Sequence, residues 1–237
     1  MSNNFFRFKQ FTVFQEHCAM KVGTDGVLLG AWANVTDCKH ILDIGTGTGL
    51  IALMLAQRNT NALIDAIDID EGCVLQAQQN VKRSPFAHQI DIKRKSFQKY
   101  ATKTDLRYGL IVSNPPYFQN ALKSPCSSRT HARHTDSLSF FEIISQGSSL
   151  LSEKGRIALI LPHEFKQQLL EHASTVNLFA ARITNVCPLP HKPPKRLLIE
   201  LGRNQTGCVE DNLTIELSRH HYTDEFIALT KEFYLYL

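Results

Sequence analysis

Residues whose types suit the binding of an amino group follow an apolar run near the middle of the chain. Residues 113–117 read Ser-Asn-Pro-Pro-Tyr, and residues 108–112 before them are typical of a buried strand. The prolines end this strand and restrict its backbone, so that the Asn114 amide and the Pro115 carbonyl are held at its carboxyl end. Two oxygen acceptors beside the ring of Tyr117 suit a planar group with an exocyclic NH2, such as adenine. A turn with a surface tyrosine is the alternative interpretation.

A glycine-rich loop lies between an apolar strand and an apolar helix earlier in the chain. Residues 45–49 read Gly-Thr-Gly-Thr-Gly, and Leu50 stands where a dinucleotide-binding loop has its last glycine. The glycines permit a tight turn and the close approach of a ligand. Asp43, at the end of the strand, would repel a pyrophosphate but would suit a ligand that carries an ammonium group and no phosphate. S-adenosylmethionine is such a ligand, and a nicotinamide oxidoreductase is disfavoured.

The next two predicted strands carry candidate partners for the nucleoside part of such a ligand. Asp68 ends the strand predicted over residues 64–70, about 25 residues after Asp43, and a carboxylate near this spacing binds the diol of a ribose. A third strand ends at Ser96 and Phe97, where the adenine of the ligand would lie. Phe97 either packs on that ring or belongs to the core.

A polar segment precedes the first apolar helix of the chain. Residues 21–26 read Lys-Val-Gly-Thr-Asp-Gly, and Thr24 and Asp25 stand where the N-cap of the helix would be. The segment either caps the helix or presents hydroxyl, carboxylate and backbone N–H groups to a ligand. By the same reasoning, Asp70 is expected to cap the helix predicted over residues 71–81.

Basic residues gather in two segments that we expect to contact RNA phosphates. Residues 119–135 contain no acid and follow the Asn-Pro-Pro-Tyr turn, and a long loop above an adenine pocket suits a clamp on a nucleic acid. A solvated loop without a partner is the alternative. The second segment, residues 191–196, reads His-Lys-Pro-Pro-Lys-Arg. The residues of the two segments expected to bind RNA are Lys123, Arg129, Arg133, Lys192 and Lys195.

Composition sets further bounds. The 237 residues are 43% hydrophobic and 20% charged with a formal net charge of +4, which fits a globular protein and permits a polyanionic partner. No apolar run approaches membrane-spanning length and the first residues lack a signal-like apolar region, so we expect a cytoplasmic protein. Six scattered cysteines without a Cys-x-x-Cys pair argue against zinc and a disulfide framework, so no metal is expected.

Strands and helices alternate along most of the chain. This order predicts an α/β fold with a doubly wound, mostly parallel, Rossmann-like sheet of seven strands and an antiparallel strand near the C-terminus. Residues 182–186 and 197–201 are expected to form the closing antiparallel pair. We expect one domain over residues 1–237, with a short N-terminal extension over about residues 1–33 in which residues 5–15 form a hairpin or a lid. All the candidate sites above would then open on one crevice at the carboxyl ends of the strands.

These motifs together carry a resemblance to a known family. The Asp-Ile-Gly-Thr-Gly-Thr-Gly loop over residues 43–49, Asp68 and Asn-Pro-Pro-Tyr over residues 114–117 resemble, in order and spacing, the S-adenosylmethionine-dependent amino-group methyltransferases. Residues 21–25 and 222–235 further resemble the bacterial tRNA1(Val) (adenine-N6)-methyltransferase family, which modifies the adenosine 3′ of the anticodon in valine tRNA. The resemblance runs nearly end to end.

The resemblance implies a cofactor, a substrate and a set of site residues. S-adenosylmethionine would be the cofactor and tRNA the partner of a monomeric enzyme. Asp68 would hold the cofactor ribose, and the glycine loop and Gly23–Asp25 would hold its methionine end. The implied cofactor-binding residues are Lys21, Gly23, Thr24, Asp25, Asp43, Gly45, Thr46, Gly47, Gly49, Asp68, Ile69, Ser96, Phe97 and Asn114. Those implied to hold and activate the target base are Asn114, Pro115, Pro116 and Tyr117. Many relatives have an acidic residue where Ser96 stands.

The chemistry expected of such a site needs no strong base. The N6 lone pair of adenine is delocalised into the ring. Oxygen acceptors at Asn114 and Pro115 would accept hydrogen bonds from the amino group and make its nitrogen more nucleophilic. Orientation and electrostatic complementarity would supply most of the rate. Stacking on Tyr117 would hold the extruded base, at roughly 1–3 kcal/mol per base.

Several alternatives stay open at this stage. A glutamine side-chain amide presents the same NH2 geometry, so that a protein-glutamine N5-methyltransferase is the nearest rival. DNA adenine N6 and rRNA guanine N2 are further candidate targets. From another class, the chain could be a catalytically silent RNA-binding module, which a cofactor titration would distinguish.

Overall fold

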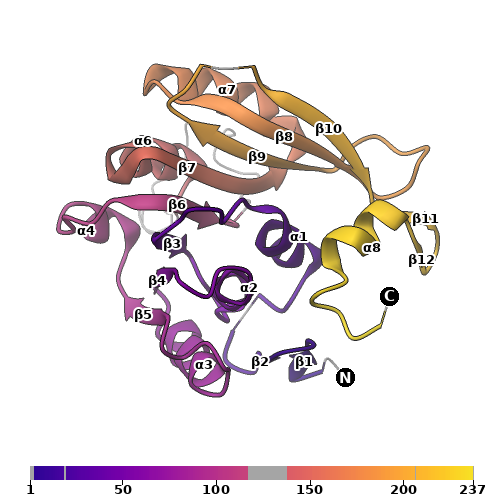
Figure 1. Cartoon of the computed structure of the whole chain (residues 1–237), viewed down its shortest axis with the longest axis horizontal. Helices are drawn as coiled ribbons and strands as arrows, with labels where there is room; N and C mark the ends of the chain where they lie inside the picture. The colour runs from indigo at the N-terminus through magenta and orange to yellow at the C-terminus, as the bar shows by residue number, and fades with distance from the viewer. Residues whose placement is uncertain (1–2, 19, 117–137, 206, 237) are drawn as a thin grey trace, which may run out of the picture.

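The computed structural model describes residues 3–18, 20–116, 138–205 and 207–236 (Figure 1). Its centre is a sheet of eight strands in the order β10-β8-β9-β7-β6-β3-β4-β5, with β5 at the bottom of Figure 1. The strands of this sheet are β3 (His40–Ile44), β4 (Leu63–Asp68), β5 (Ile90–Arg94), β6 (Tyr108–Ser113), β7 (Leu151–Pro162), β8 (Phe179–Cys187), β9 (Arg196–Gly202) and β10 (Val209–Thr214).

The strand directions confirm the predicted doubly wound, mostly parallel sheet. β5, β4, β3, β6 and β7 are parallel to one another, whereas β9 is antiparallel to both β7 and β8. The expected pairing of residues 182–186 with 197–201 is confirmed by the register of Arg182 with Glu200. The sheet has eight strands rather than seven because β10 adds a further parallel edge beside β8.

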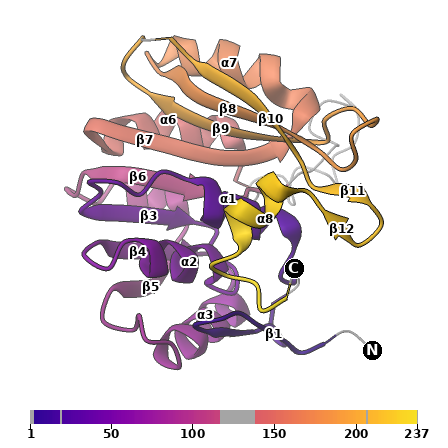
Figure 2. The same cartoon turned by 45° about the vertical axis from the view of Figure 1, so that its right-hand side comes forward.

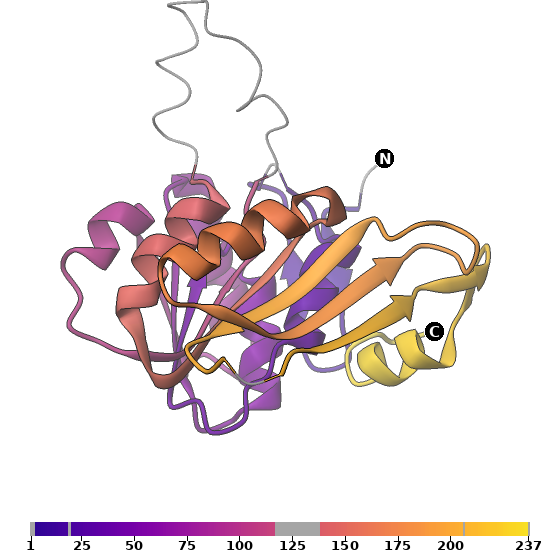
Figure 3. The same cartoon turned by 90° about the horizontal axis from the view of Figure 1, so that it is seen from above.

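Helices cover both faces of the sheet. Seen from above, α6 and α7 lie along one face and α8 along the other (Figure 3). The helices are α1 (Thr24–Trp32), α2 (Leu50–Arg58), α3 (Glu71–Lys82), α4 (Phe97–Ala101), α6 (Phe140–Leu150), α7 (Lys166–Thr175) and α8 (Asp224–Thr230), with a 3₁₀ turn at His163–Phe165. In the described part of the chain, no helix is both long and apolar enough to cross a membrane.

Alternation along the central strands explains why two separate cores form. Ile41 belongs to the buried cluster beneath α1 and α2, whereas Leu42 belongs to the cluster beneath α4, α6 and α7. Val112 and Ile111 divide between the same two clusters in β6. Successive side chains of a strand point to opposite faces, so a nearly continuous apolar run is what a strand covered on both faces requires.

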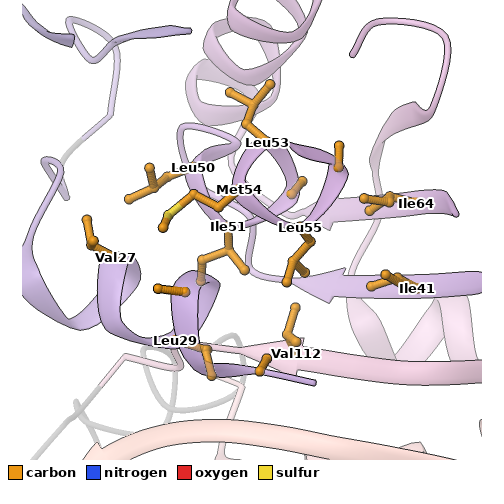
Figure 4. Packing of buried hydrophobic residues seen from close by; sticks show 14 of the residues in the cluster. Val27, Leu29, Ile41, Leu50, Ile51, Leu53, Met54, Leu55, Ile64 and Val112 are labelled. Atoms are coloured by element: carbon orange, nitrogen blue, oxygen red, sulfur yellow. The ribbon is translucent and has the colours of Figure 1, made fainter. Parts of the chain in front are cut away.

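Helix α2 is apolar on every side because it lies between α1 and the sheet (Figure 4). All its residues from Leu50 to Ala56 are buried. The approach of α1 is close, since a Cβ atom at Gly30 would lie 2.7 Å from the sulfur of Met54. This packing fixes the start of α2, and with it the preceding glycine loop.

The N-terminal residues form a hairpin that packs on the C-terminal segment. β1 (Phe5–Arg7) pairs antiparallel with β2 (Thr12–Phe14), as predicted. Phe8 forms a β-bridge with Tyr234, and their rings lie 6.0 Å apart. A second hairpin, β11 (Glu216–Ser218) with β12 (His221–Tyr222), precedes α8. Figure 2 shows both ends of the chain on the same side. The N-terminal aromatic residues therefore serve packing, which supports our proposal of one domain with a docked extension.

The packing of α2 predicts a large loss of stability when Leu53 is shortened. Leu53 is fully buried, so Leu53→Ala should lower the free energy of unfolding by about 2–5 kcal/mol through lost contacts and the cavity left behind. Leu75, in α3, is 51% exposed, so Leu75→Ala makes the same change in a helix with an expected loss within about 1 kcal/mol. Urea denaturation of both variants measures the difference. Equal losses would contradict the described burial of α2.

Candidate functional site

Two adjoining cavities open where the carboxyl ends of β3, β4 and β6 meet. The larger cavity has a volume of about 580 Å³ and the smaller about 350 Å³, within the range of sites for small ligands. They meet at Met20, Gly45, Gly47 and Asn114, which line both. The expected crevice thus exists, and it has room for a nucleoside-sized ligand beside a second group.

The glycine loop forms the floor between the two cavities. Gly45, Gly47 and Gly49 have φ angles of +70°, +56° and +82°, which favour glycine. A Cβ atom at Gly45 or Gly47 would meet nothing within 4 Å, whereas one at Gly49 would lie 3.4 Å from Ala77. The first two glycines therefore leave open space at the cavities, and the third packs against α3. That space is available to a ligand approaching the loop.

Asp43 lies beneath this floor. It is fully buried, and it is not among the described residues that line either cavity. Its Oδ2 accepts a hydrogen bond of 2.6 Å from Thr46 Oγ1, whereas Oδ1 makes none, although the backbone N–H of Ala52 is near enough to lower the carboxyl's pKa. Burial, aided by the charge of Asp68, outweighs these effects and raises the pKa of Asp43 to about 7. Asp43 is thus separated from both cavities by the loop, and it contacts the loop through Thr46.

Asp68 lines the larger cavity at the carboxyl end of β4. Its Oδ2 accepts a hydrogen bond of 2.9 Å from Gly47 N, and Oδ1 accepts one of 2.9 Å from Asp70 N. Each carboxylate oxygen keeps capacity for a further hydrogen bond. The carboxylate is therefore fixed between the glycine loop and α3, in a position to bind a diol. Ile69 follows it on the same wall and is half exposed.

Ser96 and Phe97 close the far wall of the larger cavity. The Ser96 hydroxyl caps α4 by accepting a hydrogen bond of 3.4 Å from Lys99 N. Phe97 is only 3% exposed and packs in the core beneath α4, yet it also lines the cavity. Phe97 is therefore a core residue that presents part of its surface to the cavity, and its packing on an adenine stays a prediction.

Residues 21–25 wall the smaller cavity, but their local structure differs from the expectation. The N-cap of α1 is Gly23 with φ −134°, so the expectation that Thr24 or Asp25 caps the helix is wrong. Asp25 Oδ2 instead accepts a hydrogen bond of 2.8 Å from Arg196 Nε, which ties α1 to β9. Lys21 Nζ donates to the carbonyl of Gln15. The expected cap at Asp70 is confirmed, because its side chain accepts a hydrogen bond from the third residue of the helix, and Ser96 caps α4 in the same way.

The residues expected to hold an amino group stand at the mouth of the cavities. β6 ends at Ser113, whose hydroxyl donates a hydrogen bond of 2.7 Å to the carbonyl of Ile44 in β3. Asn114 is half-buried and lines both cavities, whereas Pro115 is buried and Pro116 exposed along the larger one. The other members of these expected sets, Tyr117, Lys123, Arg129 and Arg133, lie outside the described residues.

Lys192 and Lys195 lie at the same edge of the sheet as the cavities. Both are exposed in the turn between β8 and β9. Arg196 pairs with Pro162 at the carboxyl end of β7, which places this turn beside the crevice. Across the described ranges, no group of three or more histidine, cysteine, aspartate or glutamate residues could hold a metal ion.

One segment of the cavity wall was not expected from the sequence. His17 and Met20 line the larger cavity, in the segment that joins the N-terminal hairpin to α1. Gln76, which is 1% exposed, accepts backbone hydrogen bonds from Glu16 and His17 and so holds this segment against α3. A buried glutamine on the apolar face of a predicted helix is the signal that could have indicated such a partner.

Comparison with known proteins gives consistent findings. Residues 18–182 match the family described as methyltransferase small domain. The chain is 51% identical to the tRNA1(Val) (adenine(37)-N6)-methyltransferase of Parabacteroides distasonis over 99% of both chains. It is 40% identical to that of Salmonella paratyphi B over 100% of this chain and 97% of the relative. A solved structure of a predicted O-methyltransferase from Agrobacterium tumefaciens has a TM-score of 0.67 at 19% identity, over 88% of this chain and 96% of that one. This last likeness concerns the fold alone.

The buried Asp43 carboxyl predicts a pH dependence of stability. The pKa of Asp43 rises from 3.8 to about 7 on folding, so the folded chain binds the proton more tightly, and stability falls as the pH rises from about 5 through 7. Asp43→Asn should remove this part of the slope and gain stability relative to the natural protein at about pH 8. Urea denaturation across this range measures both. Asp105→Asn, at an exposed position, should keep the natural slope, and an unchanged slope in Asp43→Asn would contradict the effect of burial.

Proposed function

Because the chain belongs to the family of tRNA1(Val) (adenine(37)-N6)-methyltransferases, within the methyltransferase small domain family, we propose that it transfers a methyl group from S-adenosylmethionine to N6 of the adenosine at position 37 of valine tRNA. The observation that carries this function is the placement of Asn114 where the two cavities meet. An amide at that junction can reach both a methyl donor and an acceptor amino group. We further propose that the protein acts as a cytoplasmic monomer.

The cavities fit S-adenosylmethionine in the chemistry of their walls. This cofactor supplies a methyl group on a positively charged sulfur. Asp68 would bind the ribose hydroxyls, since its carboxylate is fixed by Gly47 N–H and keeps acceptor capacity. Ile69, Ser96 and Phe97 would contact the adenine in the larger cavity.

The smaller cavity would take the methionine end of the cofactor. The glycine loop leaves it open space, and a cation bound there would favour the charged form of the buried Asp43 carboxyl. The further residues proposed to line this end are Lys21, Gly23, Thr24, Asp25, Gly45, Thr46, Gly47 and Gly49. Of these, Asp25 and Lys21 would mainly hold the wall of the cavity in place. Their charged groups already bind Arg196 and the Gln15 carbonyl.

The residues after β6 would orient and polarise the target amino group. The Asn114 side-chain oxygen and the Pro115 carbonyl would accept hydrogen bonds from its two N–H groups, which localises the lone pair of N6 toward the methyl group. Pro116 stiffens this turn. Tyr117 would stack on the extruded base. Since orientation and electrostatics carry the reaction, the proton lost from N6 can pass to water.

The RNA would lie across the edge of the sheet that holds the crevice. Lys192 and Lys195 are exposed there and would bind phosphates. We propose the same role for Lys123, Arg129 and Arg133. Phosphate contacts of this kind position a nucleic acid, while the pocket itself selects the base.

A labelling experiment tests the proposed function. The purified protein is incubated with methyl-labelled S-adenosylmethionine and, separately, with unmodified tRNA, DNA, rRNA and a release-factor-like protein, followed by mass analysis of nucleosides or peptides. Label should appear as N6-methyladenosine in tRNA. Label in glutamine would mean that the Asn114 pocket takes a protein amide, and absence of cofactor binding would indicate a silent RNA-binding module.

Two substitutions should separate chemistry from cofactor binding. Asn114→Ala should lower the turnover rate by about 10²–10³ while cofactor affinity persists, because it removes an acceptor used in the transition state. Asp68→Ala should instead weaken cofactor binding. Calorimetry and single-turnover methylation measure the two effects, with Asn61→Ala at an exposed turn as the control. Full turnover in Asn114→Ala would refute the proposed chemistry.

A further inference from the structure

A third depression in the surface opens beside the larger cavity, around the end of β5. It has a volume of about 550 Å³ and shares Ile69, Lys95, Ser96 and Gln98 with the larger cavity, so that the two are continuous. Three exposed basic residues, Arg94, Lys95 and Lys99, line it, and we call it the basic hollow. Nothing in the proposed binding of cofactor or base uses these three charges.

Two acidic residues, Glu71 and Glu142, lie around the basic hollow. Glu71 forms an ion pair of 2.7 Å with Arg94. The Glu142 carboxylate caps α6 by accepting a hydrogen bond of 3.0 Å from Ser139 N, and it accepts another of 3.1 Å from Gln98 Nε2. Burial acts to raise the pKa of Glu142, but these hydrogen bonds outweigh it and hold the pKa below its usual value. Within the described residues, Lys95 and Lys99 form no ion pair, so the hollow carries two unpaired lysines beside the single carboxylate of Glu142 that lines it.

The basic hollow and the Lys192/Lys195 turn stand on opposite sides of the crevice. In the sheet order, β5 lies on one side of β4, β3 and β6, and β9 lies on the other side beyond β7. Five strand spacings of about 4.8 Å separate β5 from β9, which is about 24 Å along the edge. At 3.4 Å per stacked nucleotide, this distance corresponds to about seven nucleotides. One nucleotide in the crevice cannot contact both clusters, but a folded RNA can.

We propose that the basic hollow binds a backbone phosphate of the tRNA substrate, on the side of the crevice opposite to Lys192 and Lys195. This inference rests on the proposed function and extends it. The RNA then lies across the carboxyl edge of the sheet and is held at two places, with the target base entering the crevice between them. The enzyme thereby selects a folded stem-loop over a short single strand that carries the same adenosine.

Charge reversal in the basic hollow tests this proposal. Lys99→Glu alters a side chain that does not line the larger cavity, and Lys95→Glu/Lys99→Glu removes both free charges. In tRNA binding, the slope of log K against log salt should fall by about 0.7–0.9 for each lysine removed. The KM for tRNA should rise in both variants, about tenfold or more in the double variant, and Lys99→Glu should keep the kcat and the cofactor affinity of the natural protein.

A matched control and a short RNA sharpen the test. Lys39→Glu/Lys154→Glu makes the same change of charge at the amino ends of β3 and β7, far from the crevice, and should keep the natural slope. An RNA of about five nucleotides is too short to span both clusters, so the natural protein should bind it with a smaller salt slope than it binds tRNA. Lys192→Glu/Lys195→Glu should add its effect to that of the hollow variant on full tRNA.

The outcomes separate this inference from the proposed function. If the natural protein methylates tRNA but the hollow variants keep its salt slope, the basic hollow binds no phosphate and the proposed function stands. A loss of cofactor affinity without a change in salt slope would likewise overturn the inference and assign Lys95 to the cofactor wall. If the natural protein neither binds nor methylates tRNA, the proposed function fails and the inference fails with it.

Discussion

The hydrogen bonds that tie the glycine loop to β4 are the contacts on which the site depends. The N–H groups of Gly45 and Thr46 share the carbonyl of Ile67, and Gly47 N–H binds the Asp68 carboxylate. These bonds fix the position of the loop, which leads into α2, above the carboxyl end of β4. The shape of both cavities and the direction of the Asp68 side chain follow from that one junction. Helix α2 can hold it only because apolar neighbours surround the helix on all sides.

Asp43 shows how stability and function are divided in this fold. A carboxyl group that is buried with one unbonded oxygen is unfavourable to the folded state when charged. Its hydrogen bond to Thr46 steadies the loop from below, where no ligand can displace it. Asp43, which the sequence suggests as a partner for a cationic ligand, therefore supports the glycine loop from below, one layer away from the cavities. Because burial raises the pKa of Asp43 to about 7, its charge at neutral pH is partial and is carried at a cost in folding energy.

The sequence predicts the features that depend on local rules. Strand ends, the glycine loop, the Asp70 cap and the N-terminal hairpin follow from periodicity and residue preference over a few neighbours, and the structure has them. The sequence alone could not show that Asp43 lies below the cavity, since the depth of a side chain depends on packing between elements. The wall formed by His17 and Met20 depends on Gln76, about 60 residues away. The helix start at Gly23 was missed because Asp25 pairs instead with Arg196 on a distant strand.

The contact between the two ends of the chain has a consequence for biosynthesis. The hairpin that precedes the His17 segment pairs with Tyr234, and Lys9 N–H donates a hydrogen bond of 2.8 Å to the carbonyl of Phe233. On the ribosome these partners are made long after the hairpin, so the hairpin cannot dock until they have emerged. The parallel core can assemble earlier, as its strands appear. Docking of the hairpin is therefore a late step of folding, and a chain that stops before Phe233 leaves the hairpin without this contact.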